Sequence, residues 1–264
     1  MENTCLNCNH LITENFCTYC GQKKYKRIDR KYLTDEVQYM VIHTNKGFFY
    51  SLKNIIKAPG KTARDFIDGN RVNHYKPLLM AFVLSGISAF ISFKIIDMNS
   101  VMERYFAAHT EQKIAVSWMN DLTSVMSSYS SALMLLLIPI VSIVTVLVFR
   151  KWGQNYYEHI IMNTYIQILY TIISIVLLSP IMYFLKDSPD TFMLVVIGST
   201  FIIYPIIMTW FYKQFYSQKS ISDVIIKVLL LMAVGIILYL GLIFAVAIYM
   251  IITNPAMFQQ MQPK

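Results

Sequence analysis

Long apolar runs, separated by short polar stretches, fill the chain from residue 78 onward. A helix needs about 20 mostly apolar residues to cross the hydrocarbon core of a bilayer, and five runs meet that length. Because backbone polar groups in lipid must be satisfied within their own segment, we expect each run to be a helix. The five predicted transmembrane spans are residues 78–96, 132–149, 160–185, 192–212 and 228–252.

The overall composition supports this interpretation. Hydrophobic residues make up 56% of the 264 residues and charged residues make up 14%, whereas an ordinary soluble domain is about 25% charged. Five such runs in one chain argue against the buried helices of a soluble protein. The sequence therefore predicts an all-α polytopic membrane protein whose transmembrane domain covers residues 78–264.

The distribution of charge predicts the orientation in the membrane. Residues 1–77 carry 13 Lys and Arg against 7 Asp and Glu, whereas residues 78–264 carry 10 against 8. The polar stretch 97–131 is acidic, and the next polar stretch contains Arg150 and Lys151. Short loops rich in Lys and Arg stay on the cytoplasmic side of a membrane. We therefore expect a cytoplasmic N-terminus and, with five spans, a C-terminus outside.

All four cysteines lie within the first 20 residues, in the pairs Cys5-x-x-Cys8 and Cys17-x-x-Cys20. Each pair can present two thiolates to one cation, and the short link between the pairs folds them together into a tetrahedral set. Zinc suits four thiolates because it has no redox chemistry and accepts tetrahedral geometry. We predict a zinc ribbon over residues 1–24 that holds one structural Zn2+ per chain and leaves no coordination position for catalysis.

Other chemistries use the same type of ligand. Two disulfides need an oxidising compartment, which conflicts with a cytoplasmic N-terminus. A redox-active Cys-x-x-Cys pair is expected within a thioredoxin-like α/β pattern, which this sequence lacks. An iron–sulfur cluster also binds cysteine thiolates, and the spacing alone does not distinguish iron from zinc. His10 is a spare candidate ligand that four cysteines make unnecessary.

Residues 25–77 form a basic bridge between the ribbon and the first span. Apolar residues recur at helical spacing around 33–41, around 48–57 and from about 61 to 68. Basic amphipathic helices beside a span favour anionic inner-leaflet lipids, so one interpretation places residues 33–77 in the headgroup plane. The other packs the apolar faces on the inner ends of the spans, and both can hold at once. Membrane attachment accounts for the positive charge, so we expect no nucleic-acid partner.

Several short motifs carry a resemblance to a known family. They are Phe16-Cys17-x-x-Cys20-Gly21-Gln22-Lys23, Lys46-Gly47-Phe48-Phe49-Tyr50-Ser51-Leu52, Ala58-Pro59-Gly60-Lys61, Gly69-Asn70-Arg71 and Tyr75-Lys76-Pro77. Together with the order of ribbon, bridge and spans, they make the chain similar to a bacterial membrane family with an N-terminal zinc ribbon, domain of unknown function 3667. The resemblance implies this architecture and a bacterial inner (cytoplasmic) membrane, and it implies no activity.

Polar side chains within the spans are the default functional candidates of a membrane protein. Asn163 and Gln167, four residues apart, share one stripe of the third predicted span. Glu158 and His159 precede that stripe, at the entrance of the span. More often, such residues hydrogen-bond to neighbouring helices. The chain contains no phosphate-binding loop, nucleophile elbow or His-Glu-x-x-His motif, so no catalytic residue is assigned.

These patterns favour a non-enzymatic, multi-pass inner-membrane protein. Its cytoplasmic zinc ribbon is expected to act as a docking or assembly module for a protein partner, because a closed metal site is attached to a nearly charge-free set of spans. One alternative is a small-molecule or lipid transporter with Asn163 and Gln167 on its path. A second alternative is an unrecognised membrane enzyme that uses Glu158 and His159.

Overall fold

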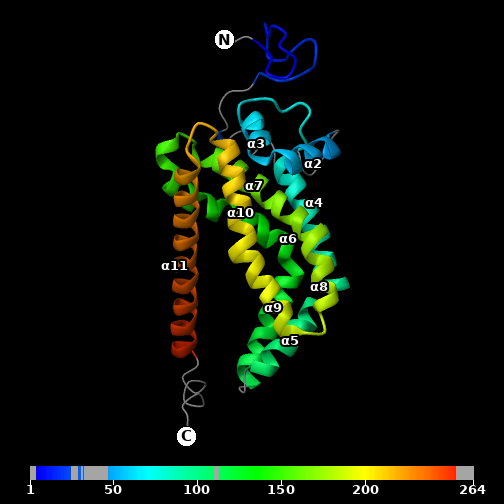
Figure 1. Ribbon diagram of the computed structural model, residues 1–264, viewed down its shortest axis with the longest axis vertical. Coiled ribbons are helices and arrows are strands. Elements are labelled where there is room, and N and C mark those ends of the chain that lie inside the picture. The colour runs from blue at the N-terminus through cyan, green and yellow to red at the C-terminus, as the bar shows by residue number, and fades with distance from the viewer. Residues whose placement is uncertain (1–3, 25–28, 31, 33–46, 110–112, 254–264) are drawn as a thin grey trace.

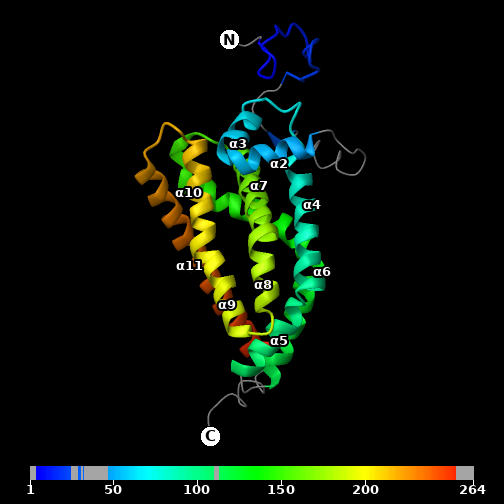
Figure 2. The same cartoon turned by 45° about the vertical axis from the view of Figure 1, so that its right-hand side comes forward.

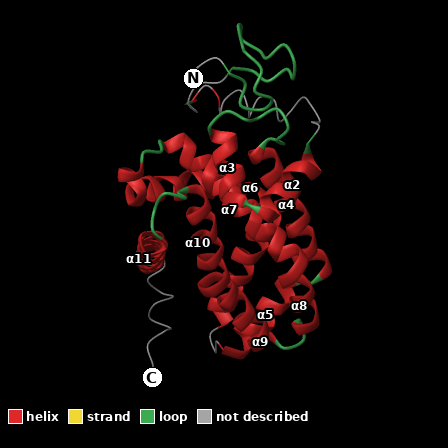
Figure 3. Cartoon of the chain, turned by 45° about the horizontal axis from the view of Figure 1, so that its top comes forward, coloured by secondary structure: helices red, strands yellow, loops and turns green. Residues whose placement is uncertain are grey.

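The computed structural model describes residues 4–24, 29–30, 32, 47–109 and 113–253 (Figure 1). Helices make up the body of the molecule, whereas the N-terminal ribbon consists of loops and turns (Figure 3). The helix predicted around residues 33–41 lies outside the described residues. The ribbon and the end of the last helix lie at opposite ends of the molecule, as an odd number of spans requires (Figures 1 and 2).

Five helical segments in the described part of the chain are long and apolar enough to cross a membrane, which confirms a multi-pass membrane protein. The third begins earlier than predicted because Asn155 caps it, and the fifth begins earlier because the more polar residues from Ile221 onward are already helical. The five segments are Pro77–Ile95, Ala132–Trp152, Tyr156–Leu185, Pro189–Phe215 and Ile221–Ala245.

Each of these segments is built from one to three helical elements. They are α4 (Pro77–Phe90) with η1 (Ile91–Ile95), α6 (Lys113–Phe149) with η2 (Arg150–Trp152), α7 (Tyr156–Ile173) with η3 (Ser174–Leu178) and α8 (Ser179–Leu185), α9 (Pro189–Gly198) with η4 (Ser199–Ile203) and α10 (Tyr204–Phe215), and α11 (Ile221–Thr253).

Two prolines explain where the third and fourth spans change their winding. Proline lacks an N–H group, and its ring clashes with the carbonyl four residues earlier in an α-helix. For Pro180 that carbonyl belongs to Val176, and for Pro205 it belongs to Phe201. Both carbonyls lie within five-residue π-helical segments, η3 and η4. The wider π turn accommodates each proline without ending the helix.

Within the polar stretch 97–131, the described residues from Met98 onward are helical and do not form a loop. It contains α5 (Met98–His109) and the first half of α6, which begins at Lys113. Val101 of α5 is buried together with Ile96 and Phe192, so this pair of helices is packed against the spans at the end far from the ribbon. Phe192, the partner of Val101 on α9, is distant from it in the chain, so local sequence patterns did not predict this contact.

The bridge contains two helices close to the predicted positions, α2 (Phe48–Lys57) and α3 (Pro59–Ile67). Both lie across the ribbon-side ends of the spans (Figure 2). Ala63 and Phe66 of α3 belong to the main buried cluster, and the Phe66 ring lies edge-on to Tyr165 of α7. Packing on the spans is therefore realised. The side chain of Phe49 on α2 is 81% exposed, which leaves one face of α2 for contact with lipid.

Gly60 sets the distance between α3 and α10. A Cβ atom at this position would overlap the carbonyl oxygen of Phe211 and would lie 2.6 Å from the backbone nitrogen of Phe215. The backbone N–H of Gly60 donates a hydrogen bond to Oε1 of Gln214 at 3.1 Å. Only glycine allows two backbones to approach this closely, so Gly60 seats the bridge on the fourth span.

The main buried cluster is concentrated at the ribbon-side end of the spans. Its largest fully buried aromatic residues include Phe66, Phe149, Tyr165 and Phe211. Helix α11 joins this cluster through residues of its first turns and then stands apart from the other helices (Figure 1). The remaining surface is rich in exposed aliphatic and aromatic side chains, as expected of helices that face lipid.

Replacing Gly60 by alanine is expected to destabilise the protein. The added methyl group has no space between α3 and α10, and overpacking of this kind costs on the order of 1–3 kcal/mol. Thermal unfolding of the purified protein in detergent should show a lower midpoint for Gly60→Ala. Gly198→Ala is the matched control, because a Cβ atom there meets nothing within 4 Å and alanine favours a helix. Equal midpoints for Gly60→Ala and the wild type would contradict the close approach.

Candidate metal centre

The ribbon consists of two equivalent turns whose residues are related by an offset of twelve. The backbone N–H of Cys5 donates to the carbonyl of His10 at 2.8 Å, and the N–H of Cys17 donates to the carbonyl of Gln22 at 2.7 Å. Each turn is closed by an antiparallel bridge, Thr4 with Leu11 and Phe16 with Lys23. The chain thus uses the same local fold twice to present one pair of thiols each time.

A left-handed residue follows the second cysteine of each turn. Asn9 has a φ of 59° and Gly21 has a φ of 73°, as the residue types predict. Their backbone N–H groups donate to the carbonyls of Cys5 and Cys17, both at 2.8 Å. These bonds fold each Cys-x-x-Cys segment back on itself, so that both of its sulfur atoms point to the same side.

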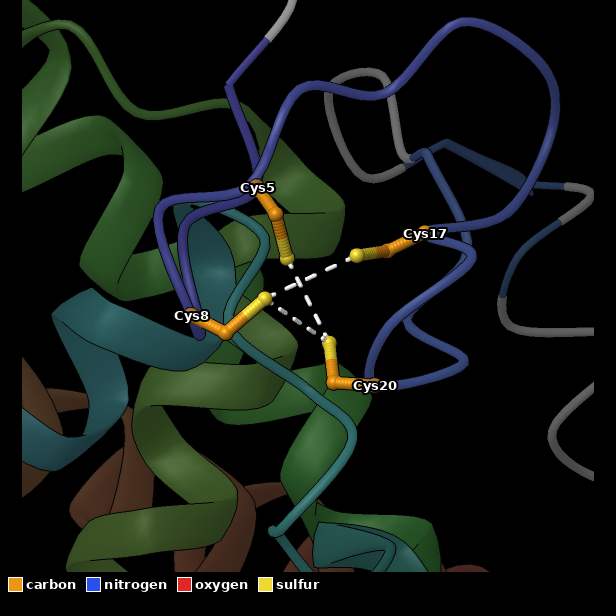
Figure 4. A group of neighbouring side chains, drawn as sticks. All are labelled: Cys5, Cys8, Cys17 and Cys20. Atoms are coloured by element: carbon orange, nitrogen blue, oxygen red, sulfur yellow. Dashed lines mark hydrogen bonds between the residues drawn. The ribbon is translucent and has the colours of Figure 1, made fainter.

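The four sulfur atoms converge on one point (Figure 4). All of them lie within 4.8 Å of one another. The Sγ atoms of Cys5 and Cys20 are 3.5 Å apart, those of Cys8 and Cys17 are 3.6 Å apart, and those of Cys8 and Cys20 are 3.4 Å apart. Four thiolates around zinc, each at about 2.3 Å, are separated by about 3.8 Å. The cluster therefore has the size and the donor set for a single tetrahedral metal ion.

The sulfur distances also bear on the disulfide alternative. A disulfide bond is about 2.05 Å long, and all four cysteines are free thiols in the structure. With four ligands already converging, a bound ion has no open position for a substrate, so the geometry is that of a structural site. The arrangement of four converging thiols is compatible with zinc and with iron, because both metals bind cysteine thiolates.

The thiols of Cys8 and Cys20 differ in acidity. The Asn7 side chain donates a hydrogen bond to Cys20, and with the backbone N–H of Gln22 and the neighbouring thiols it lowers the pKa of Cys20 to about 6. The backbone N–H of His10 acts in the same direction on Cys8, but desolvation and the surrounding thiols outweigh it and raise the pKa of Cys8 to about 12. A cation must displace the protons of the less acidic thiols, so metal affinity falls as the pH falls.

The ribbon has almost no apolar core of its own. Among its described residues, the buried hydrophobic side chains are those of Cys5, Ile12 and Cys17. A unit of this size cannot bury enough apolar surface to fold alone, so metal binding would supply most of its folding free energy. His10 is not one of the converging ligands. Its ring stacks on Tyr19, with ring centroids 4.1 Å apart.

Two hydrogen bonds attach the ribbon to the loop between α3 and α4. The buried side chain of Gln22 donates through Nε2 to the carbonyl of Gly69. Nδ2 of Asn73 donates to Oδ1 of Asn7 at 2.8 Å. Asn7 therefore contacts both a sulfur ligand and the bridge. The sequence assigned no contact to Asn7 or Gln22. Asn7 lies between the two cysteines of the first pair, and Gln22 follows the second pair within the motif that carries the family resemblance.

Glu158 and His159 both lie at the start of α7, where Glu158 caps the helix and His159 is buried beside an aromatic ring. Oε2 of Glu158 accepts from the backbone N–H of Asn155 at 2.8 Å, and Oδ1 of Asn155 accepts from the N–H of Glu158 at 2.9 Å. This reciprocal pair is a capping box that begins the helix. The His159 ring is fully buried near Phe149, with ring centroids 6.2 Å apart.

Asn163 joins α7 to α6. Its Nδ2 donates to Oγ of Ser142 at 2.9 Å and to Oγ1 of Thr145 at 3.0 Å, and all three side chains are buried. Gln167, one turn later, donates to Sδ of Met134 at 3.2 Å and to Oγ1 of Thr171 at 3.3 Å. The predicted polar stripe thus faces α6, and the contacts of Asn163 are those by which polar residues hold membrane helices together.

Comparison with known proteins identifies part of the bridge. The family described as a protein of unknown function (DUF3667) matches residues 45–89, which contain α2, α3, the loop that contacts the ribbon, and nearly all of α4. The match supports a domain of unknown function in this part of the chain, and it does not include the four cysteines. No curated protein matches the chain, and no solved structure matches it either.

Metal analysis of the purified chain is expected to find about one zinc ion per molecule. Cys8→Ser removes one of the four ligands and should lower the zinc content by at least tenfold, whereas His10→Ala should leave it unchanged because His10 is outside the ligand set. Elemental analysis by mass spectrometry measures both contents. One equivalent of iron in place of zinc, or an unchanged zinc content in Cys8→Ser, would contradict the assignment.

Proposed function

We propose that the chain is an integral inner-membrane protein whose zinc ribbon docks or assembles another protein. The observation that carries this proposal is the combination of a closed, structural type of metal site with a large exposed apolar surface on the same ribbon. A closed site performs no chemistry on a substrate. Its physical effect is to hold a small surface in one shape, and that surface is then available for recognition.

The ribbon exposes more apolar surface than its size requires. The side chains of Leu11 and Tyr19 are each 72% exposed, and that of Phe16 is 54% exposed. Contiguous apolar patches on the water-exposed part of a protein mark sites of interaction. Lys23 and Lys24 lie beside them in the sequence. A protein partner with an apolar, weakly acidic surface matches this combination.

The attachment of the ribbon supports the same function. The hydrogen bonds of Asn7 and Gln22 orient the ribbon relative to the bridge, and α3 in turn is seated on α7 and α10. The ribbon projects beyond the ends of the spans (Figure 2). A partner bound there would be held at a defined place next to the membrane, which is what an assembly module requires.

The proposed orientation places the ribbon in the cytoplasm. The ribbon-side end of the spans carries Arg150, Lys151 and Lys219, whereas the other end carries Asp187 and Asp190 near its basic residues. This asymmetry follows the distribution of Lys and Arg across bacterial inner membranes. A reducing cytoplasm also keeps the four thiols available for zinc.

The two alternative functions use residues that already have structural contacts. Asn163 is engaged by Ser142 and Thr145, and the carboxylate of Glu158 is engaged by the cap of α7. Packing and capping account for these positions. The transporter and the membrane enzyme therefore stay alternatives without an observation of their own, and the docking proposal is preferred.

Partner capture tests the docking proposal. Photo-cross-linking from the ribbon in native membranes should trap a defined protein with the wild type. The double variant Leu11→Ser/Phe16→Ser, which keeps all four cysteines, should reduce the trapped amount at least tenfold without loss of zinc. Phe49→Ser on α2 is the matched control, since it removes a similarly exposed ring outside the ribbon. Equal capture by the wild type and the double variant would overturn the proposal.

Labelling of the chain termini tests the proposed topology. A reporter that is active only in the cytoplasm should be active when it is fused at the N-terminus and inactive when it is fused after residue 264. A short reporter inserted after Gly153, in the loop between η2 and α7, should behave as the N-terminal one does. Both termini on the same side would contradict five spans.

A further inference from the structure

The corner where the ribbon-side ends of α6, α10 and α11 meet concentrates basic side chains. Within the described residues, two acidic residues lie near them, Asp223 in the first turn of α11 and the buried Glu158 at the start of α7, whose charge acts on Tyr216. The corner therefore has a strong excess of positive charge at the boundary between the spans and water. The basic residues of this corner, called here the basic corner, are Arg150, Lys151, Lys213, Lys219 and Lys227.

Several contacts fix the geometry of the basic corner. Nζ of Lys227 on α11 donates to the carbonyl of Val148 at the end of α6, at 2.8 Å. Nζ of Lys213 on α10 donates to the carbonyl of Lys219 at 2.8 Å. Nζ of Lys219 lies 5.6 Å from the centre of the Trp152 ring. These contacts hold the ribbon-side ends of α6, α10 and α11 close together.

Aromatic rings of α6, η2 and α10 pack together beside the basic corner. Phe149 stacks on Tyr212, with centroids 4.4 Å apart, and Trp152 lies edge-on to Tyr216 at 4.6 Å. Aromatic residues of this kind stand at the headgroup level of a bilayer. Arg150 and Lys151 are exposed, and within the described residues neither has a hydrogen-bond or ion-pair partner. Their charge is available to an anion at headgroup depth.

Apolar surface begins directly beside these charges. On α6, Leu147 is 65% exposed and Ile143 is 53% exposed; on α11, Ile226 is 62% exposed and Leu230 is 45% exposed. Beyond its first turns, α11 stands apart from the other helices, and the two helices diverge below the corner (Figure 1). A ligand that satisfies both the charges and the diverging apolar faces must carry an anionic head and long hydrocarbon chains.

We propose that the basic corner binds one anionic phospholipid, with its phosphate between Arg150, Lys151 and Lys219 and its acyl chains against the exposed faces of α6 and α11. Basic sites between transmembrane helices on the cytoplasmic side recognise such headgroups. The residues proposed to hold the phosphate lie outside the bridge, and one bridge side chain, that of Arg64 on α3, lies 6.0 Å from the centre of the Tyr216 ring. The proposed site is also independent of the docking function of the ribbon and holds whether or not the ribbon has a protein partner.

Native mass spectrometry of the full-length protein, titrated in detergent with dioleoylphosphatidylglycerol, tests this site. The wild type should bind one molecule much more tightly than it binds dioleoylphosphatidylcholine. Arg150→Gln/Lys151→Gln, which alters only exposed side chains, should raise the dissociation constant for phosphatidylglycerol by about 20-fold. Lys219→Gln should raise it by about fivefold.

Two control variants and one competitor sharpen the outcome. Lys94→Gln/Lys186→Gln removes the same charge at the other end of the spans, and Lys53→Gln/Lys57→Gln removes it from α2; both should bind phosphatidylglycerol within about twofold of the wild type. A large excess of glycerol phosphate should not displace the lipid. Loss of binding in either control, unchanged binding in Arg150→Gln/Lys151→Gln, or displacement by the headgroup alone would overturn the proposal.

Discussion

The hydrocarbon of a bilayer offers the backbone no hydrogen-bond partner, and this constraint governs the largest part of the structure. Every segment that crosses the membrane is helical, and where Pro180 and Pro205 would break the pattern, a π turn keeps the helix continuous. Side chains follow the same rule. The hydroxyl of Thr164 donates a hydrogen bond to the carbonyl of Ile160 in its own helix. The side chain of Asn163 donates to two hydroxyl groups on the neighbouring helix α6.

The ribbon faces the opposite problem, because it lies in water and has too few apolar residues for a core. Four converging thiols would replace that core once they bind a metal ion, and the apolar side chains of the ribbon stay exposed. The close approach at Gly60 fixes the bridge against the spans, and the amide contacts of Asn7 and Gln22 fix the ribbon against the bridge. Together they position the ribbon relative to the spans. The bridge residues of these contacts, Gly60, Gly69 and Asn73, lie within the segment that matches a family of unknown function.

Local signals in the sequence predicted the features that depend on neighbours along the chain. Span length, the two Cys-x-x-Cys turns, the left-handed Asn9 and the amphipathic bridge helices are of this kind. Contacts between distant residues could not be predicted in this way. The partners of Gly60 on α10, of Asn163 on α6 and of Asn7 in the bridge lie from 18 to 154 residues away, and residue type alone does not identify a partner at that separation.

Within the described residues, helix α11 is held by the other helices at one end only. Val224, Val228 and Leu231 anchor its first turns, and from Gly235 to Ala245 its side chains are exposed. At 1.5 Å per residue, the part beyond the anchor is about 30 Å long, so a tilt of about 10° at the anchor moves the far end by about 5 Å. Membrane helices accommodate a thinner bilayer by tilting, and a tilt of α11 would turn about this anchor, beside Lys227 of the basic corner.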